Sequence, residues 1–129
     1  MAASAMERFA RSQIIALAER LEQDLQAAAR KQDEEAVHRI RVSIRRFVQS
    51  LTAFAQYVPE NWSKKVRKQL RQVMRRSSKV RDLDIAMLFL KKHRSPADVL
   101  ASRRERASLK LAAALASPQW HSRLSLERS

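Results

Sequence analysis

The chain of 129 residues contains no glycine and only three prolines. Tight β-hairpin turns and phosphate-cradling loops depend on glycine, because a residue without a Cβ adopts their backbone conformations most easily. The sequence therefore argues against a hairpin-rich β fold and against a glycine-loop phosphate site. Its common residues, among them Ala, Leu, Arg, Lys, Gln and Glu, are strong helix formers. We expect an all-α fold, with residues 1–129 forming one domain.

Apolar repeats, together with residues that typically begin or end helices, predict helices over residues 4–30, 33–57, from 60 onward, 95–116 and 119–126. Asp33 is expected to cap the second helix, and Ser95 the fourth, with Pro96 in its first turn. The pair Ser117-Pro118 is expected to end the fourth helix. Connections this short favour an antiparallel, up-and-down bundle of four to six helices.

Two of these helices carry a strong core stripe with apolar residues spaced by three and four. In the second helix the stripe is Val37, Ile40, Ile44, Phe47, Leu51 and Phe54. In the third helix it is Trp62, Val66, Leu70, Val73, Ser77 and Val80. We expect the third helix to continue past Asp82 or to restart there, because Ile85, Leu88 and Phe89 resume the apolar pattern.

The excess positive charge is concentrated in the middle of the chain. The formal net charge is +14, of which residues 36–81 carry +12, against −2 in residues 1–35 and +4 in residues 82–129. A charge that served only solubility would be dispersed and mixed in sign, whereas a concentrated block indicates a polyanionic partner. Charge alone leaves open the alternative of a solvated basic face.

Within this block the cations form two rows, each on one face of a helix. On the second helix His38, Arg41 and Arg45 stand at positions i, i+3 and i+7, flanked by Arg46. On the third helix the row is Lys64, Lys68, Arg71 and Arg75. Both rows are expected to lie off the core stripes and to converge on a shared groove. Arginine suits phosphate, because its planar fork donates two parallel hydrogen bonds.

The acidic residues of the third helix give no sign of catalysis. Asp82 and Asp84 are two residues apart and so point to different helix faces, which makes them a poor acid–base pair. We interpret them as structural residues that orient an arginine, or in the case of Asp82 as a helix cap. A metal held by them together with His38 is conceivable, but the spacing does not require it. The chain has no cysteine, which excludes disulfides and thiolate chemistry. We predict no catalytic residue, metal or cofactor.

Other polar residues are interpreted as surface. His93 and His121 are isolated in the sequence. Arg103, Arg104 and Arg106 are interpreted as a solvated face, although they are a second possible anion site.

Two segments resemble a known family. The run His38-Arg39-Ile40-Arg41-Val42-Ser43-Ile44-Arg45-Arg46, followed by Phe47, fits the pattern His-x-x-Arg-Val-x-x-Arg-Arg of the conserved histidine α-helical domain, CHAD. Residues 70–85 resemble the family's second block, which ends in Leu-Gly-x-x-Arg-Asp-x-Asp-Val. Residues 113–124 are similar to its closing helix.

The resemblance implies an all-helical domain that binds inorganic polyphosphate through a basic channel and catalyses nothing. Transferred position by position, the anion-binding residues would be His38, Arg41, Arg45, Arg46, Arg71 and Arg81, with Lys68 and Arg75 beside them.

The chain departs from the family pattern at three points. Val48 stands where the family usually has another basic residue, and Ser77-Ser78 replaces the Leu-Gly pair. The family normally has two helical halves that line one channel, whereas this chain has one. We therefore expect a homodimer, because a twofold interface would restore the second half.

The leading hypothesis is thus non-catalytic polyphosphate binding. The alternatives are a nucleic-acid-binding or nucleoid-type protein that uses the same basic face, and an enzyme that processes phosphate with Asp82, Asp84 and a divalent metal. No apolar run approaches the length of a membrane span, and residues 1–10 do not resemble a signal peptide. The expected location is the cytoplasm, including association with polyphosphate granules.

Overall fold

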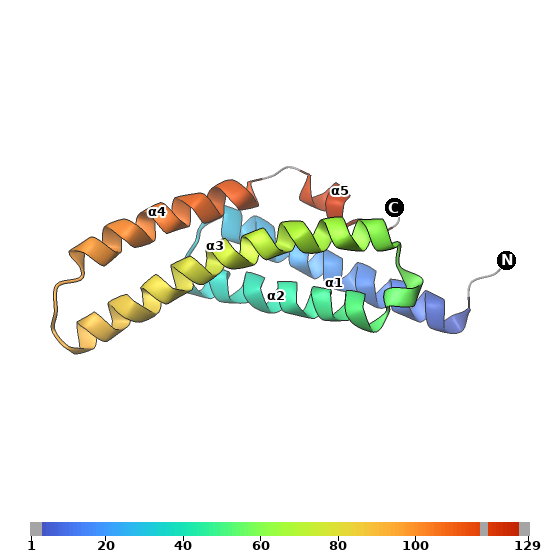
Figure 1. Cartoon of the computed structure of the whole chain (residues 1–129), viewed down its shortest axis with the longest axis horizontal. Helices are drawn as coiled ribbons and strands as arrows, with labels where there is room; N and C mark the ends of the chain where they lie inside the picture. The colour runs from blue at the N-terminus through green and yellow to red at the C-terminus, as the bar shows by residue number, and fades with distance from the viewer. Residues whose placement is uncertain (1–3, 117–118, 127–129) are drawn as a thin grey trace.

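The computed structural model describes residues 4–116 and 119–126. They form α1 (Ala5–Arg30), α2 (Glu34–Ala53), the short 3₁₀ helix η1 (Ala55–Tyr57), α3 (Glu60–Lys92), α4 (Asp98–Leu115) and α5 (Trp120–Leu124) (Figure 1). The four long helices run alternately up and down, and the described residues contain no strand. The prediction of an all-α antiparallel bundle is confirmed. None of the described helices combines the length and the apolar character that crossing a bilayer requires.

The first two helices begin directly after a side-chain cap, and the predicted cap Asp33 is confirmed. The Ser4 hydroxyl accepts a hydrogen bond from the Glu7 amide (3.0 Å), and the Asp33 carboxylate accepts one from the Ala36 amide (2.8 Å). Each cap satisfies an amide at the open end of its helix. The second helix ends at Ala53 rather than near residue 57, and η1 follows it.

The prediction that Ser95 caps the fourth helix is wrong. Ser95 instead helps to end α3, because its amide donates to the Leu90 carbonyl (2.9 Å). Arg94 has a φ of 54° there, the left-handed conformation that glycine usually supplies in this type of helix ending. With Ser95 engaged in that ending, α4 begins later, at Asp98. The predicted break at residues 117–118 lies outside the described residues.

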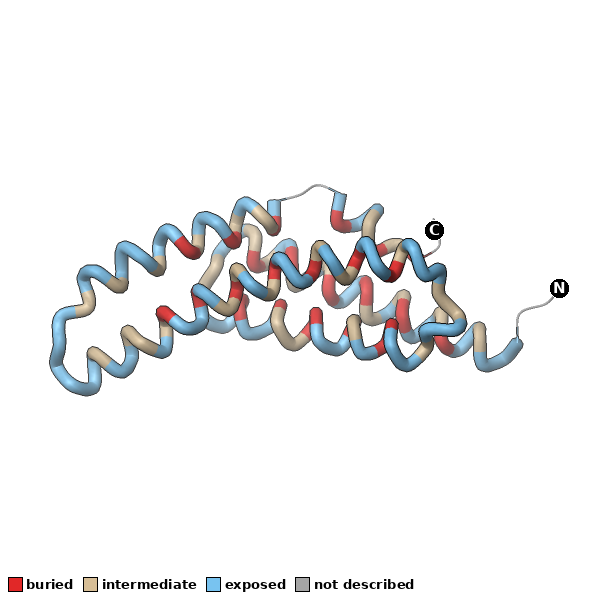
Figure 2. The backbone as a smooth tube through the Cα atoms, in the orientation of Figure 1, coloured by how far each residue is buried: buried red, intermediate tan, exposed pale blue. Residues whose placement is uncertain are grey.

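α3 is continuous through Asp82 over its 33 residues, so that residue caps no restarted helix. Its inner face carries buried residues from Ser63 to Leu83. Figure 2 shows the buried positions concentrated where the long helices run together. Phe47 is fully buried among them and meets the Trp62 ring edge-on at 6.3 Å. The Trp62 indole also donates to the Arg123 carbonyl (2.9 Å), which attaches α5 to the bundle.

The last turns of α3 and the first turns of α4 form a hairpin that projects beyond α1 and α2 (Figure 1). Ile85, Leu88 and Phe89 resume the apolar pattern of the helix, as the sequence shows, but they are not buried. Their exposed fractions are 56%, 52% and 58%. We call these three residues the outer stripe. It is uncovered because α2 begins at Glu34 and does not extend along this part of α3.

Candidate functional site

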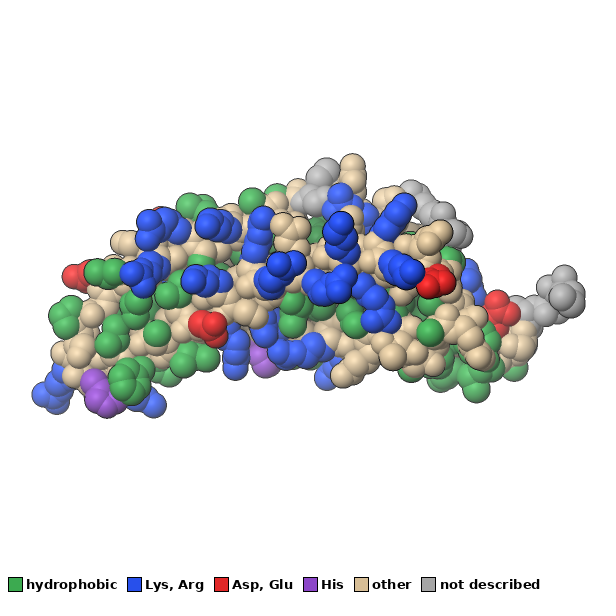
Figure 3. Space-filling view, viewed as in Figure 1, with side chains coloured by type: hydrophobic (Ala, Val, Ile, Leu, Met, Phe, Trp, Pro, Cys, Tyr) green, Lys and Arg blue, Asp and Glu red, His purple; other side chains and the backbone are tan. Residues whose placement is uncertain are grey.

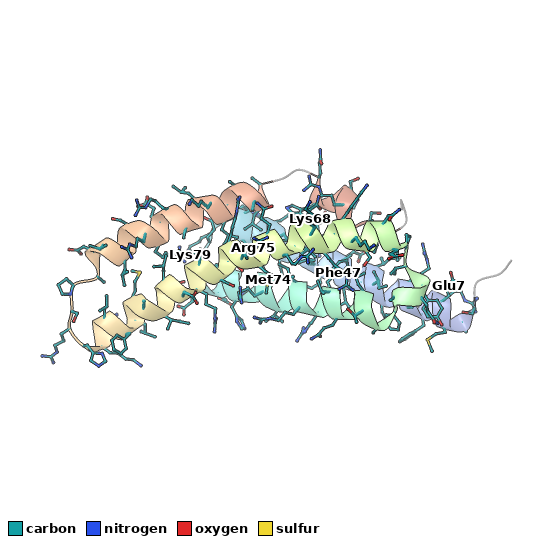
Figure 4. All side chains as sticks on the ribbon, viewed as in Figure 1. Glu7, Phe47, Lys68, Met74, Arg75 and Lys79 are labelled. Carbon is teal, nitrogen blue, oxygen red and sulfur yellow. The ribbon has the colours of Figure 1, made fainter. Side chains whose placement is uncertain are left out.

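The basic residues of α3 gather on one face of the molecule. Figure 3 shows Lys and Arg side chains along the middle of the visible face, with hydrophobic side chains between them. Lys68, Arg75 and Lys79 come from the same side of α3, whereas Met74 lies between α3 and α2 (Figure 4).

Arg41 does not belong to a free surface row, contrary to the sequence prediction. It is half-buried at the contact between α2 and α3. Its Nη1 atom lies within hydrogen-bonding distance of the Met74 carbonyl (3.1 Å), the Ser77 hydroxyl (2.9 Å) and the Ser78 hydroxyl (2.7 Å). Arg41 thus fastens the two helices that carry the predicted rows.

The position of Arg41 also affects its own ionisation. Partial burial, followed by the charges of Arg45 and Arg81, lowers the pKa of the Arg41 guanidinium below its ordinary value, and Asp82 opposes this shift. Burial is the largest cause of the lowered pKa, and the charges of the two neighbouring arginines add to it.

Beside Arg41 a groove of about 420 Å³ runs between α2 and α3. We call it the α2–α3 groove; it is lined by Ile44, Arg45, Val48, Gln49, Arg67, Leu70, Arg71 and Met74. Arg45 from α2 and Arg71 from α3 both reach it, so each predicted row contributes one arginine to the same hollow. Ile44 and Leu70 are buried beneath it, which makes the floor apolar.

A second hollow adjoins the groove along α3. It is lined by Lys68, Arg71, Met74, Arg75 and Ser78. Arg71 and Met74 line both hollows, so the two lie side by side. The adjoining hollow is cationic, with three basic side chains spaced about one helical turn apart.

The cations of the molecule divide into two groups according to their protein partners. Lys64 pairs with Glu60 (3.1 Å), Arg39 pairs with Glu35, and the Arg76 guanidinium donates to the Lys110 carbonyl (2.8 Å). Many other cations have neither a hydrogen bond nor an ion pair within the described part of the chain, and they include seven of the eight predicted anion-binding residues: His38, Arg45, Arg46, Lys68, Arg71, Arg75 and Arg81. All seven are exposed, and all were singled out from the sequence.

The structure does not bring every predicted residue into the two hollows. His38 and Arg46 are exposed on α2 and line neither of them. Arg81 is exposed on α3 and acts on Arg41 through its charge.

Asp84 has a structural partner on another helix. Its carboxylate pairs with the Arg104 guanidinium through contacts of 2.9 and 3.3 Å, and Arg104 also donates to the Gln32 carbonyl (2.6 Å). The interpretation of Arg104 as part of a solvated face is therefore wrong, because its side chain is only 22% exposed. This contact ties α4 to α3 and to the connection between α1 and α2.

The remaining polar residues fit the surface interpretation. His93 is exposed and stacks on Phe89, with 4.2 Å between ring centroids. His121 is exposed and pairs with Glu22 (2.9 Å). Among the described residues no group of three His, Asp or Glu side chains is close enough to hold a metal ion, including His38 with Asp82 and Asp84.

Sequence reasoning missed Arg67 and Gln49, which both line the α2–α3 groove. The Arg67 guanidinium donates to the Thr52 hydroxyl (2.9 Å) and to the Ser63 hydroxyl (3.2 Å), so it also bridges α3 and α2. Its position four residues before Arg71 places the two on the same helix face and could have revealed it.

The family model of the CHAD domain matches residues 12–128. The chain belongs to the CHAD domain family. The suspected family is therefore confirmed, and at family level this membership relates the chain to polyphosphate. No curated protein and no solved structure matches the chain.

Two departures from the CHAD pattern acquire a structural meaning. Ser77 and Ser78 stand in place of the Leu-Gly pair, and their hydroxyls are the acceptors that Arg41 reaches on α3. Ser77 is fully buried at this contact, where the CHAD pattern has a Leu-Gly pair. Val48 adds an apolar side chain to the groove where the CHAD pattern has a basic one.

We predict that Arg41→Ala lowers the free energy of unfolding by about 1–3 kcal/mol, because it removes the donor shared by the Met74, Ser77 and Ser78 oxygens. Arg45→Ala, which removes an exposed arginine from the same helix, is expected to change it by no more than about 0.5 kcal/mol. Urea denaturation followed by circular dichroism measures both. Equal losses in the two variants would contradict the bracing role of Arg41.

Proposed function

We propose that the chain binds inorganic polyphosphate in the α2–α3 groove and along the adjoining row of α3, and that it catalyses no reaction there. The observation that carries the proposal is the group of exposed cations without protein partners, several of which meet at these two hollows. Like charges at helical spacing repel one another, so a polyanion that neutralises them gains binding free energy.

In this proposal the groove residues have different tasks. Arg45 and Arg71 bind the phosphates from opposite helices, because each guanidinium can donate two parallel hydrogen bonds to the oxygens of one phosphate. Lys68 and Arg75 extend the contact along α3, where lysine acts as a point charge. Arg41 contributes charge at one end while it holds the helices in place.

The outlying residues complete the proposed anion path. His38, Arg46 and Arg81 lie outside the two hollows and would contact a longer chain that continues past them. Asp82 and Asp84 orient arginines, and Asp84 has such a partner in Arg104. We propose no metal and no cofactor for this function.

We also propose that two copies of the chain associate through the outer stripe. Arg41 lies opposite Ser77 and Ser78, and α2 and α3 are antiparallel. Glu34, the start of α2, is seven residues before Arg41, and Asp84 and Ile85 are seven residues after Ser77 and Ser78. Because the two helices are antiparallel, Glu34 therefore lies opposite Asp84 and Ile85. From there α3 continues to Lys92 without α2 beside it. Exposed apolar stripes of this kind mark interaction surfaces, and a second copy would also supply a second helical half.

A cytoplasmic location, including association with polyphosphate granules, is part of the proposal. The main alternative is a nucleic-acid-binding protein that uses the same cations, since phosphate contacts dominate that kind of binding as well.

We predict that Arg45→Ala combined with Arg71→Ala weakens polyphosphate binding by about tenfold or more, since two charge-assisted phosphate contacts are lost. The slope of log affinity against log salt concentration should also flatten by about 1.4, in line with two fewer neutralised phosphates on a single-stranded polyanion. Fluorescence anisotropy with labelled polyphosphate measures both quantities. The control variant is Arg103→Ala with Arg106→Ala, which removes the same charge from exposed positions on α4.

Equal losses in the control variant would show that only net charge matters and would contradict the assigned site. Displacement of polyphosphate by double-stranded DNA at equal phosphate concentration would favour the nucleic-acid alternative. Release of phosphate from polyphosphate in the presence of Mg²⁺ or Mn²⁺ would contradict the non-catalytic assignment.

We predict that the chain is a dimer in solution and that Leu88→Glu makes it a monomer, because a buried carboxylate without a partner opposes association. Light scattering after size-exclusion chromatography measures the mass. Leu109→Glu is the matched control, since Leu109 is an exposed leucine of α4 outside the outer stripe. A monomeric unmodified chain, or a Leu88→Glu variant that stays dimeric, would contradict this interface.

A further inference from the structure

The α2–α3 groove contains more apolar surface than a purely inorganic anion can use. Its cations stand at the rim, and the rest of the lining consists of Ile44, Val48, Leu70 and Met74 together with the amide of Gln49. Inorganic polyphosphate consists of charged oxygens throughout and gains nothing from an apolar floor. An anion that also carries an apolar, planar body would use both parts of this site.

We propose that the groove binds nucleoside polyphosphates, with the base over the apolar floor and the phosphates along Lys68, Arg71 and Arg75. This inference rests on the proposed anion site and names a further class of ligand for it. The two hollows share Arg71 and Met74, so a ligand that fills the groove with its base has its phosphates beside the cations of α3.

The size and the rim of the groove suit a base. A hollow of about 420 Å³ falls within the range of small-molecule sites. Arginine guanidinium planes stack well on aromatic faces, and Arg45 lines the groove on the α2 side. Gln49 offers an amide that can both donate to and accept from the polar edge of a base.

The same features argue against an alkyl phosphate as the occupant. An alkyl chain would leave the amide of Gln49 and the guanidinium of Arg67 against hydrocarbon, where polar groups lose hydrogen bonds to water. Arg67 is held at the groove by Thr52 and Ser63, so it cannot turn away without losing those contacts. A base, with polar edges and an apolar face, fits this mixture of side chains.

The test compares adenosine triphosphate with inorganic tripolyphosphate by isothermal titration calorimetry on the full chain, without Mg²⁺ and at one ionic strength. Both ligands carry three linked phosphates, and the nucleotide has the lower charge. We expect the nucleotide to bind about tenfold more tightly or better, which is the gain that base stacking typically gives. Decyl phosphate is expected to bind more weakly than the nucleotide.

Val48→Lys should bring the ratio of the nucleotide affinity to the tripolyphosphate affinity close to one, because it replaces part of the apolar floor with a charge. Gln49→Ala removes the amide without adding charge and should also lower this ratio. It therefore tests the inference even if the Val48→Lys variant does not fold. The matched control is Val99→Lys, which adds the same charge at an exposed position of α4 and should leave the ratio unchanged.

If tripolyphosphate binds as tightly as the nucleotide, or decyl phosphate binds more tightly, the inference is overturned while polyphosphate binding stands. If neither phosphate ligand nor long-chain polyphosphate binds, the proposed function itself is wrong. A ratio that falls equally in Val48→Lys and Val99→Lys would also overturn the assignment of the base to the groove.

Discussion

The antiparallel register of α2 against α3 is the constraint on which the other features depend. Arg41 sets it at one point, through the serine hydroxyls of α3, and Arg67 sets it at another, through Thr52 of α2. Buried apolar side chains alone tolerate sliding between helices, whereas a fixed donor facing fixed acceptors does not. This register decides which side chains meet across the groove and where α3 passes the start of α2.

The distribution of acids reinforces this arrangement. Most acidic residues with partners serve contacts that hold helices or their ends: Asp24 accepts from Ser43 on α2, Asp33 caps α2, and Asp84 joins α3 to α4. The exposed cations beside the groove have no such carboxylates. The positive potential at the groove therefore has two causes. Arginines are concentrated there, and the acidic residues form structural contacts elsewhere in the molecule.

Much of this could be read from the sequence, because helix periodicity and caps are local. The absence of glycine, the apolar stripes and Asp33 predict the helices, and the family motif identifies the cations. What could not be read depends on how helices meet. The burial of Arg41, the ion pair of Arg104 and the exposure of Phe89 each require knowing which turn of one helix faces which turn of another. Spacing along a single helix does not contain that information.

The unbroken length of α3 has a consequence for any assembly built on it. Arg71 and Leu88 are on one helix without glycine or proline, at about 26 Å from each other at 1.5 Å per residue. If two copies meet antiparallel at their Leu88 residues, the arginines of their two grooves are about 50 Å apart along the helix direction. In such a dimer, anionic chains shorter than that span would occupy one groove, whereas longer chains would bridge both grooves and gain avidity.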